Sequence, residues 1–205
     1  MPPRHRTTLL AGLSLGTAMA MMAVAACSSA VQGPDSRTVQ SAEAPFAWFN
    51  AAAAPAGWRT MELPDGTGVL SVPPDAAPAE SDPGSVSATV SSPTGELRIY
   101  LNATPRQGSE SLDNWNAFRL DHLADENSSP PTKIAGRSGM AFRGGTGSCV
   151  EDSYMTRVAN NRYREIACIV AGSKGSSVLI VAAPADSWPL YSPVLEQAVN
   201  AYRAG

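Results

Sequence analysis

The sequence predicts a single α+β domain over residues 46–205, built as an antiparallel sheet flanked by helices. Apolar and polar residues alternate in several short stretches joined by turn residues, a pattern typical of antiparallel strands with one buried face. Two other stretches, residues 109–125 and 192–202, carry apolar side chains at helical spacing. Because a sheet and an amphipathic helix each bury one face against the other, these observations favour the α+β class.

The amino-terminal segment has the layout of an export signal. A short basic stretch with Arg4 and Arg6 precedes residues 9–26, which are rich in Leu, Ala and Met. About 20 apolar residues can also span a bilayer, but interspersed Gly and Ser residues weaken the alternative of an uncleaved anchor. Residues 24–27 read Val-Ala-Ala-Cys and resemble the lipobox of bacterial lipoproteins, in which small residues precede the acylated cysteine.

This resemblance implies a signal peptide at residues 1–26 and cleavage before Cys27. The cysteine of such lipoproteins carries a diacylglycerol and usually a further acyl chain such as palmitate, and several chains make the attachment effectively permanent. Residues 28–45 are rich in Ser, Gln, Gly and Pro and bury too little apolar surface to fold alone, so residues 27–45 form a flexible tether. We expect a lipoprotein on the extracytoplasmic face of the cell membrane, with the domain at residues 46–205.

Composition and cysteine count fit an envelope protein. The formal charge is −3 and becomes −5 when Arg4 and Arg6 leave with the signal peptide, and the charges are scattered, which argues against a nucleic-acid partner. With Cys27 lipidated, Cys149 and Cys168 remain as an even pair in a compartment where disulfides persist, so we predict a bridge between them. The abundance of Ala, Gly and Pro suggests an actinobacterial source.

The strand candidates follow one another with clear turns between them. Residues 86–90 alternate between apolar and polar, and residues 97–101 do the same after a turn with Pro and Gly, which predicts a hairpin. Residues 177–183 contain a continuous apolar run, typical of a strand covered on both faces. The remaining candidates are residues 58–63, 69–72, 150–158 and 163–170, together with residues 134–137 and 140–143, which add either another strand or a broken one.

The register of the hairpin that carries Cys168 affects the predicted bridge. A turn centred on Asn160 and Asn161 is favoured because Asn tolerates left-handed backbone angles. That turn pairs Ser153 with Cys168 and leaves Cys149 about four residues away along the ladder. The bridge therefore requires a different loop register, a bulge, or a Cys149 that lies on another element.

Two helices are predicted. The first begins near Ser109 or Ser111, either of which can cap free amide groups, and ends near Asp125. The second opens with Ser192 as its cap and Pro193 at the first helical position, where the missing N–H of proline costs nothing. Each helix carries one apolar stripe that can dock on the sheet.

Three short motifs accompany this order of elements: Pro-Ala-Gly-Trp at residues 55–58, Ser-Leu at residues 111–112 before the first helix, and Ile-Ala-Gly at residues 134–136. With the closing helix, the arrangement resembles the PsbP-like fold of small actinobacterial lipoproteins of the LpqN type. The resemblance implies a binding or assembly role rather than catalysis, and it carries over no functional residues.

The sequence offers few groups for catalysis. His122 is the only histidine left after signal removal, which excludes a multi-histidine zinc site, and no Gly-Xaa-Ser-Xaa-Gly elbow presents a nucleophile. We interpret His122 as a partly buried residue near a helix end. Residues 144–147 are glycine-rich but lack the lysine and helix of a phosphate-binding loop. We expect no catalytic residues, no metal and no cofactor.

Three acids, Glu151, Asp152 and Glu165, lie on the cysteine hairpin among several arginines. Two of them can form a carboxylate pair for acid–base chemistry. Cross-strand charge pairing on a solvated sheet face explains the same residues, and we favour that interpretation.

The aromatic residues concentrate near the first strand and the two helices. We favour a role in attaching the termini to the core. The alternative is an apolar cleft for a lipid or glycolipid, because such pockets are lined mainly by aromatic and aliphatic groups. The candidate cleft residues are Trp48, Trp58, Trp115, Phe118, Phe142 and Trp188.

These observations predict a non-enzymatic, membrane-anchored envelope protein that binds a partner protein or an envelope ligand. A lipid or glycolipid carrier with an apolar cleft is the first alternative. An atypical hydrolase that uses Glu151, Asp152 or His122 is the second.

Overall fold

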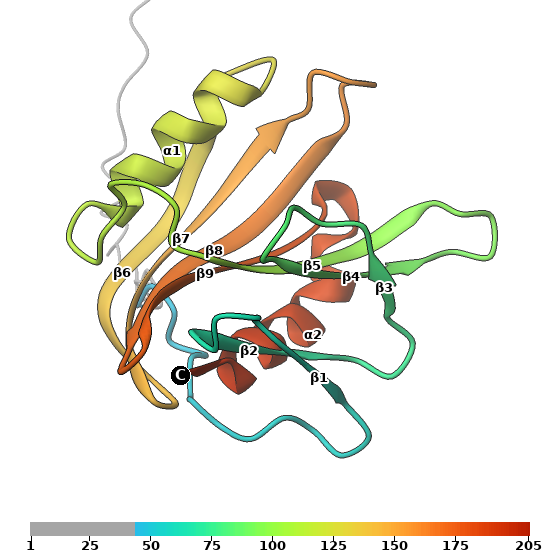
Figure 1. Cartoon of the computed structure of the whole chain (residues 1–205). Helices are drawn as coiled ribbons and strands as arrows, with labels where there is room; N and C mark the ends of the chain where they lie inside the picture. The colour runs from blue at the N-terminus through green and yellow to red at the C-terminus, as the bar shows by residue number, and fades with distance from the viewer. Residues whose placement is uncertain (1–43) are drawn as a thin grey trace, which may run out of the picture. The chain divides into compact units, whose positions relative to one another are not determined.

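Strands form two antiparallel sheets in residues 44–205, the part of the chain that the computed structural model describes. The larger sheet has seven strands in the order β3-β4-β5-β9-β8-β7-β6, and the smaller has the order β1-β2-β10 (Figure 1). The predicted signal peptide and Cys27 lie outside the described residues. The strands are β1 (Arg59–Glu62), β2 (Gly68–Val72), β3 (Ala77–Ala79), β4 (Val86–Ser91), β5 (Leu97–Pro105), β6 (Thr132–Phe142), β7 (Gly145–Met155), β8 (Arg162–Gly172), β9 (Gly175–Pro184) and β10 (Arg203–Ala204).

Helices cover both faces of the seven-stranded sheet. Helix α1 (Trp115–Glu126) packs on β7 and β8, and α2 (Trp188–Ala201) packs mainly on β9 and β2 from the opposite side (Figure 1). The predicted α+β class is confirmed. No helix among the described residues has the length and apolar character that crossing a membrane requires.

Most strand predictions are confirmed, with two changes. The two segments expected at residues 134–137 and 140–143 form one strand, β6, whose pairing with β7 shifts register at two points. The short strands β3 and β10 were not predicted, because two or three residues are too few for an alternating pattern.

The hairpin of β7 and β8 confirms the disulfide and corrects its register. Cys149 lies directly opposite Cys168, with their Cα atoms 4.1 Å apart, and the two sulfur atoms are bonded. The prediction that the turn centres on Asn160 and Asn161 was wrong, because the loop covers residues 156–161 and centres two residues earlier. The Thr156 amide donates to the Asn161 carbonyl (3.0 Å), which closes this six-residue loop.

Helix α2, the small sheet and one face of the large sheet enclose the main apolar core. The helix begins at Trp188, five residues before the predicted first position, so Pro193 lies inside it and Pro189 occupies the first turn. The buried Tyr202 hydroxyl lies 2.6 Å from Ser177 Oγ, and burial raises the pKa of Tyr202 to about 12. Position 68 must be glycine, because a Cβ there would lie 2.0 Å from the Tyr202 hydroxyl.

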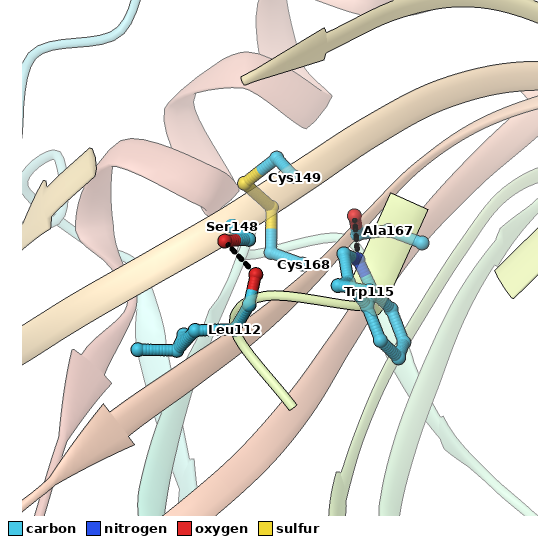
Figure 2. Close-up of a disulfide and its surroundings, with 6 residues drawn as sticks. All are labelled: Leu112, Trp115, Ser148, Cys149, Ala167 and Cys168. Carbon is cyan, nitrogen blue, oxygen red and sulfur yellow. Dashed lines mark hydrogen bonds between the residues drawn. A yellow bond between two sulfur atoms is a disulfide. The ribbon is translucent and has the colours of Figure 1, made fainter. Parts of the chain in front are cut away.

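Helix α1 begins at Trp115, later than predicted, because Ser111 and Asn114 form a turn before it. The Ser111 amide donates to Asn114 Oδ1 (2.7 Å), and the Asn114 amide donates to Ser111 Oγ (3.3 Å). Two more bonds attach this end to the sheet beside the disulfide (Figure 2). Ser148 Oγ donates to the Leu112 carbonyl (2.6 Å), and the Trp115 indole N–H donates to the Ala167 carbonyl (2.8 Å).

Candidate functional site

A groove follows one side of α1 and encloses about 510 Å³. It forms because α1 covers β7 and β8 but leaves the neighbouring strands β9 and β5 free on the same face. The helix residues that line it recur at spacings of three or four and extend from Trp115 to Glu126, a rise of about 16 Å. From the helix these are Trp115, Phe118, Arg119, His122 and Glu126, and from β5 and β9 Tyr100, Asn102, Thr104, Pro105, Val178 and Ile180. The remaining lining residues are Asp82, Ser85, Gln107, Gly108, Glu110, Tyr154 and Glu165.

Strand register separates the two ends of the groove. Thr104 pairs with Val178 at the end near the start of α1, where the segment containing Gln107 and Glu110 also contributes. At the other end, Tyr100 and Glu165 share one row, because both pair with Ala182 of β9.

Glu110 lies at the first end with an incompletely satisfied carboxylate. Its side chain is buried, with the residue 5% exposed, and Oε1 accepts a hydrogen bond from the Gln107 amide (2.7 Å). The other oxygen, Oε2, is buried without a hydrogen-bond partner among the described residues. No ion pair joins Glu110 to a described cation.

A buried charge cluster forms the inner wall of the second end. Arg119 of α1 binds both carboxylate oxygens of Glu165, at 2.7 and 3.0 Å, and Glu165 is fully buried. Although burial opposes its charge, the neighbouring Glu165 holds the pKa of Arg119 above its ordinary value. Such bidentate pairs are strong and fix the geometry of both groups.

Asp152 lies directly opposite Glu165 on β7 and is also fully buried. Neither of its carboxylate oxygens has a hydrogen-bond partner among the described residues. Burial, aided by the negative charge of Glu165, raises the pKa of Asp152 to about 8. The same two causes raise the pKa of Tyr154 beyond its ordinary range. Asp152 is therefore mostly protonated at neutral pH.

The predicted cross-strand charge pairing is confirmed for Glu151 and Arg164, but the prediction that the acids lie on a solvated face was wrong. Asp152 and Glu165 face α1, which covers them, and Glu151 points to the opposite face, where it pairs with Arg164 (2.7 Å). The Arg164 guanidinium lies 4.8 Å from the centre of the Trp188 ring. Because successive strand residues point to opposite faces, Glu151 is separated from the other two acids, and Asp152 and Glu165 are the two carboxyl groups that lie opposite each other.

His122 lines the groove but stands apart from the buried acids. It is about half exposed, lies 3.4 Å from Glu126 and stacks on Phe118 with ring centroids 6.3 Å apart. The described residues include no group of three or more His, Cys, Asp or Glu side chains placed to hold a metal ion. Of the three residues that the hydrolase hypothesis names, only His122 lines the groove, while Asp152 and Glu151 are buried on opposite faces of the sheet.

The six predicted cleft residues do not share one cleft, so that prediction was wrong as a set. Trp115 and Phe118 line the groove, on the α1 face. The other four pack in the main core on the α2 face: Trp48, Trp58, Phe142 and Trp188. Phe49 contacts Phe142 with ring centroids 4.8 Å apart, which supports the favoured interpretation that the first aromatic residues attach the amino-terminal segment to the core.

Glu110 and Arg119 were not predicted as site residues from the sequence. Arg119 had a visible signal, because it lies four residues after Trp115 and four before Leu123, within the buried stripe of the helix. Glu110 had none, because it follows a strand in a loop where charged residues are common.

Comparisons with known proteins identify the fold. No family model matches the chain, and no curated protein sequence is similar to it. The structure is similar to cyanobacterial PsbP (CyanoP) from Synechocystis sp. PCC 6803, with a TM-score of 0.54 and 8% identity, over 74% of this chain and 94% of that one.

Two further solved structures are less similar. PA94 of Pseudomonas aeruginosa, a protein of unknown function, has a TM-score of 0.46 and 10% identity over 70% of this chain and 94% of its own. LpqN of Mycobacterium tuberculosis, which is involved in cell envelope biogenesis, has a TM-score of 0.35 and 13% identity. The match covers 73% of this chain and 79% of LpqN. The match to CyanoP confirms the expected PsbP-like fold.

Proposed function

We propose that this protein is a non-enzymatic, lipid-anchored envelope protein that holds a ligand in the groove beside α1. The groove carries the proposal, because its volume of about 510 Å³ lies within the usual range for small-molecule sites. Aromatic rings from α1 and β5 lie there beside several hydrogen-bonding side chains. This lining suits a ligand that has polar groups, so within the carrier hypothesis it favours a glycolipid over a purely apolar lipid.

The envelope location rests on the amino-terminal sequence and on the cysteines. The lipobox-like residues 24–27 supply the proposed anchor at Cys27. The buried Cys149–Cys168 disulfide fits a compartment outside the cytoplasm, where disulfides persist.

Metabolic labelling tests the anchor. The chain is expressed in a bacterial host with an alkyne-tagged fatty acid, beside the variant Cys27→Ser. We expect label on the wild-type chain and none on the variant, which retains its uncleaved signal segment. Equal labelling of both chains contradicts the proposed anchor.

Native mass spectrometry of the full exported chain tests the groove. We expect the wild-type protein to retain a small ligand from its host and Ile180→Arg to lose it, because the long cationic side chain enters the groove. Val158→Arg is the matched control, since Val158 is 83% exposed in the β7–β8 loop. Ligand retained equally by all three proteins contradicts binding in the groove.

A further inference from the structure

We propose that the groove selects an elongated organic amine, and that Glu110 binds one of its ammonium groups. This inference rests on the proposed function, because it names the chemical class of the ligand for the same groove. It depends on the state of Glu110, on the balance of charges along the groove and on its aromatic lining.

The buried carboxylate of Glu110, which pairs with no described cation, is the main support for this proposal. Its residue is 95% buried, yet no described cation pairs with it and Oε2 has no hydrogen-bond partner. A buried carboxylate without compensation costs free energy, so an ammonium group that reaches Oε2 gains both a charge-assisted hydrogen bond and relief of that cost. The Gln107 amide holds Oε1 in place, which orients the carboxylate before any ligand binds.

Acidic side chains outnumber basic ones along the groove. Four acids line it, Asp82, Glu110, Glu126 and Glu165, against one arginine. Arg119 is already committed to Glu165 at two short distances, so it offers little attraction to an anionic ligand. A cleft with excess negative charge concentrates cations and repels anions.

Aromatic rings line the same groove as the acids. Trp115 and Phe118 stack along α1 with centroids 6.3 Å apart, and Tyr100 and Tyr154 line the same groove from the sheet. Ammonium groups are attracted to the faces of such rings, and alkyl chains lose apolar surface to water against them. Acids lie near both ends of α1, and the helix rises about 16 Å between Trp115 and Glu126. An extended chain with more than one amino group therefore fits better than a compact cation.

The test is an NMR titration of the full, processed protein in neutral detergent, labelled with ¹⁵N at tryptophan. The four indole signals report separately on Trp48, Trp58, Trp115 and Trp188. The probe is spermidine, and fully acetylated spermidine is the uncharged control of similar backbone. We expect saturable shifts of the Trp115 signal with spermidine, no change at the other three, and binding of the acetylated compound weaker by at least about tenfold.

Two variants assign the contact. Glu110→Gln keeps an acceptor for the Gln107 amide but removes the charge, and we expect it to weaken spermidine binding at least about tenfold. Glu96→Gln makes the same change in the exposed β4–β5 turn and should bind like the wild type. Unchanged thermal unfolding of both variants shows that the fold is intact.

Failure of the amine proposal can be told apart from failure of the proposed function. The inference is overturned if spermidine leaves Trp115 unshifted, if the acetylated compound binds equally well, or if Glu110→Gln binds like Glu96→Gln. In those cases a native ligand that is lost in Ile180→Arg would still support the proposed function. The groove itself is abandoned only when that mass-spectrometric test also fails.

Discussion

The two faces of the seven-stranded sheet differ sharply although the same strands build both. On the α2 face, β7, β8 and β9 contribute Cys149, Cys168 and Leu179 to a closed apolar core. On the α1 face, the alternating positions of β7 and β8 contribute the buried acids Asp152 and Glu165 beside an open groove. Because side chains alternate along a strand, one hairpin can stabilise the fold on one face and carry a polar site on the other.

The two faces also respond differently to substitution. Apolar contacts in the α2-face core are numerous, and losing one costs free energy in proportion to the volume removed. A buried ion pair contributes little net stability when complete, but removing one partner leaves an uncompensated charge. The α1 face should therefore be the more sensitive of the two to a single change of charge.

The largest effect is expected from Arg119→Leu. The change leaves Glu165 buried without its partner, so the free energy of unfolding should fall by about 3–5 kcal/mol. Urea unfolding monitored by tryptophan fluorescence measures it. Arg162→Leu, at an exposed position on the same hairpin, is the control and should lie within about 0.5 kcal/mol of the wild type. A loss for Arg119→Leu as small as that of the control contradicts the importance of the pair.

The double variant Arg119→Leu/Glu165→Leu sharpens this result. It removes both charges, so a large part of the lost stability should return. A double variant less stable than Arg119→Leu would show that the two charges do not act as a pair.

On the other face, removal of the disulfide should cost somewhat less. The double variant Cys149→Ala/Cys168→Ala removes a cross-link between residues 19 positions apart. For a loop of this length the chain-entropy relation gives a loss of about 3 kcal/mol in the free energy of unfolding. The expected result is a lower denaturant midpoint together with unchanged ligand binding in the groove. A loss of binding comparable to the loss of stability would contradict the independence of the two faces.

The difference between the faces explains what the sequence could predict. The alternation of β4 and β5, the apolar run of β9 and the cysteine pair indicate an antiparallel fold with a buried face, and the structure agrees. On the α1 face the same method failed, because charged residues were assumed to face water. Asp152 and Glu165 lie in phase with Val150 and Ala167, which are buried, so the phase of the strand was a better guide than the charge of the residue.

The groove itself could not be predicted from one sequence. It depends on where α1 docks, and the helix covers β7 and β8 while β5 and β9 remain free beside it. The contacts that fix this position, Ser148 to Leu112 and Arg119 to Glu165, join residues 36 and 46 positions apart. No local pattern encodes such a pairing, and the wrong cleft prediction merged aromatic residues from both faces for this reason.

The pH dependence of stability distinguishes the two faces further. Asp152 ionises near its ordinary pKa of 3.8 in the unfolded chain and at about 8 in the fold. Between these pH values Asp152 stays protonated in the folded state and is ionised in the unfolded state. Its contribution to the free energy of unfolding is therefore greatest below about pH 4 and is lost as the pH rises to about 8. The loss is up to about 1.4 kcal/mol per pH unit.

Urea unfolding of Asp152→Asn between pH 5 and 8 isolates this contribution. The variant cannot ionise, so its stability should fall less steeply with pH than that of the wild type. Asp121→Asn, at an exposed position on α1, should keep the wild-type slope. If Asp152→Asn also keeps the wild-type slope, Asp152 is not the group whose ionisation causes the loss of stability.

The smallest effects compare one buried hydroxyl on each face. Ser148 Oγ donates to Leu112 before α1, and Ser177 Oγ bonds Tyr202 in the α2-face core, with both serines fully buried. Replacing Ser148 by Ala removes one hydrogen bond and should cost about 1 kcal/mol. Replacing Ser177 by Ala removes its bonds to Tyr202 and to the Thr67 carbonyl and should cost about 1–2 kcal/mol. Only Ser148→Ala should speed amide hydrogen exchange in α1 and weaken ligand binding, because that bond helps to fix the helix wall of the groove. If Ser177→Ala changed the groove to the same degree, the two faces would be mechanically coupled through β7–β9, and the separation of the stabilising core from the binding face would have to be abandoned.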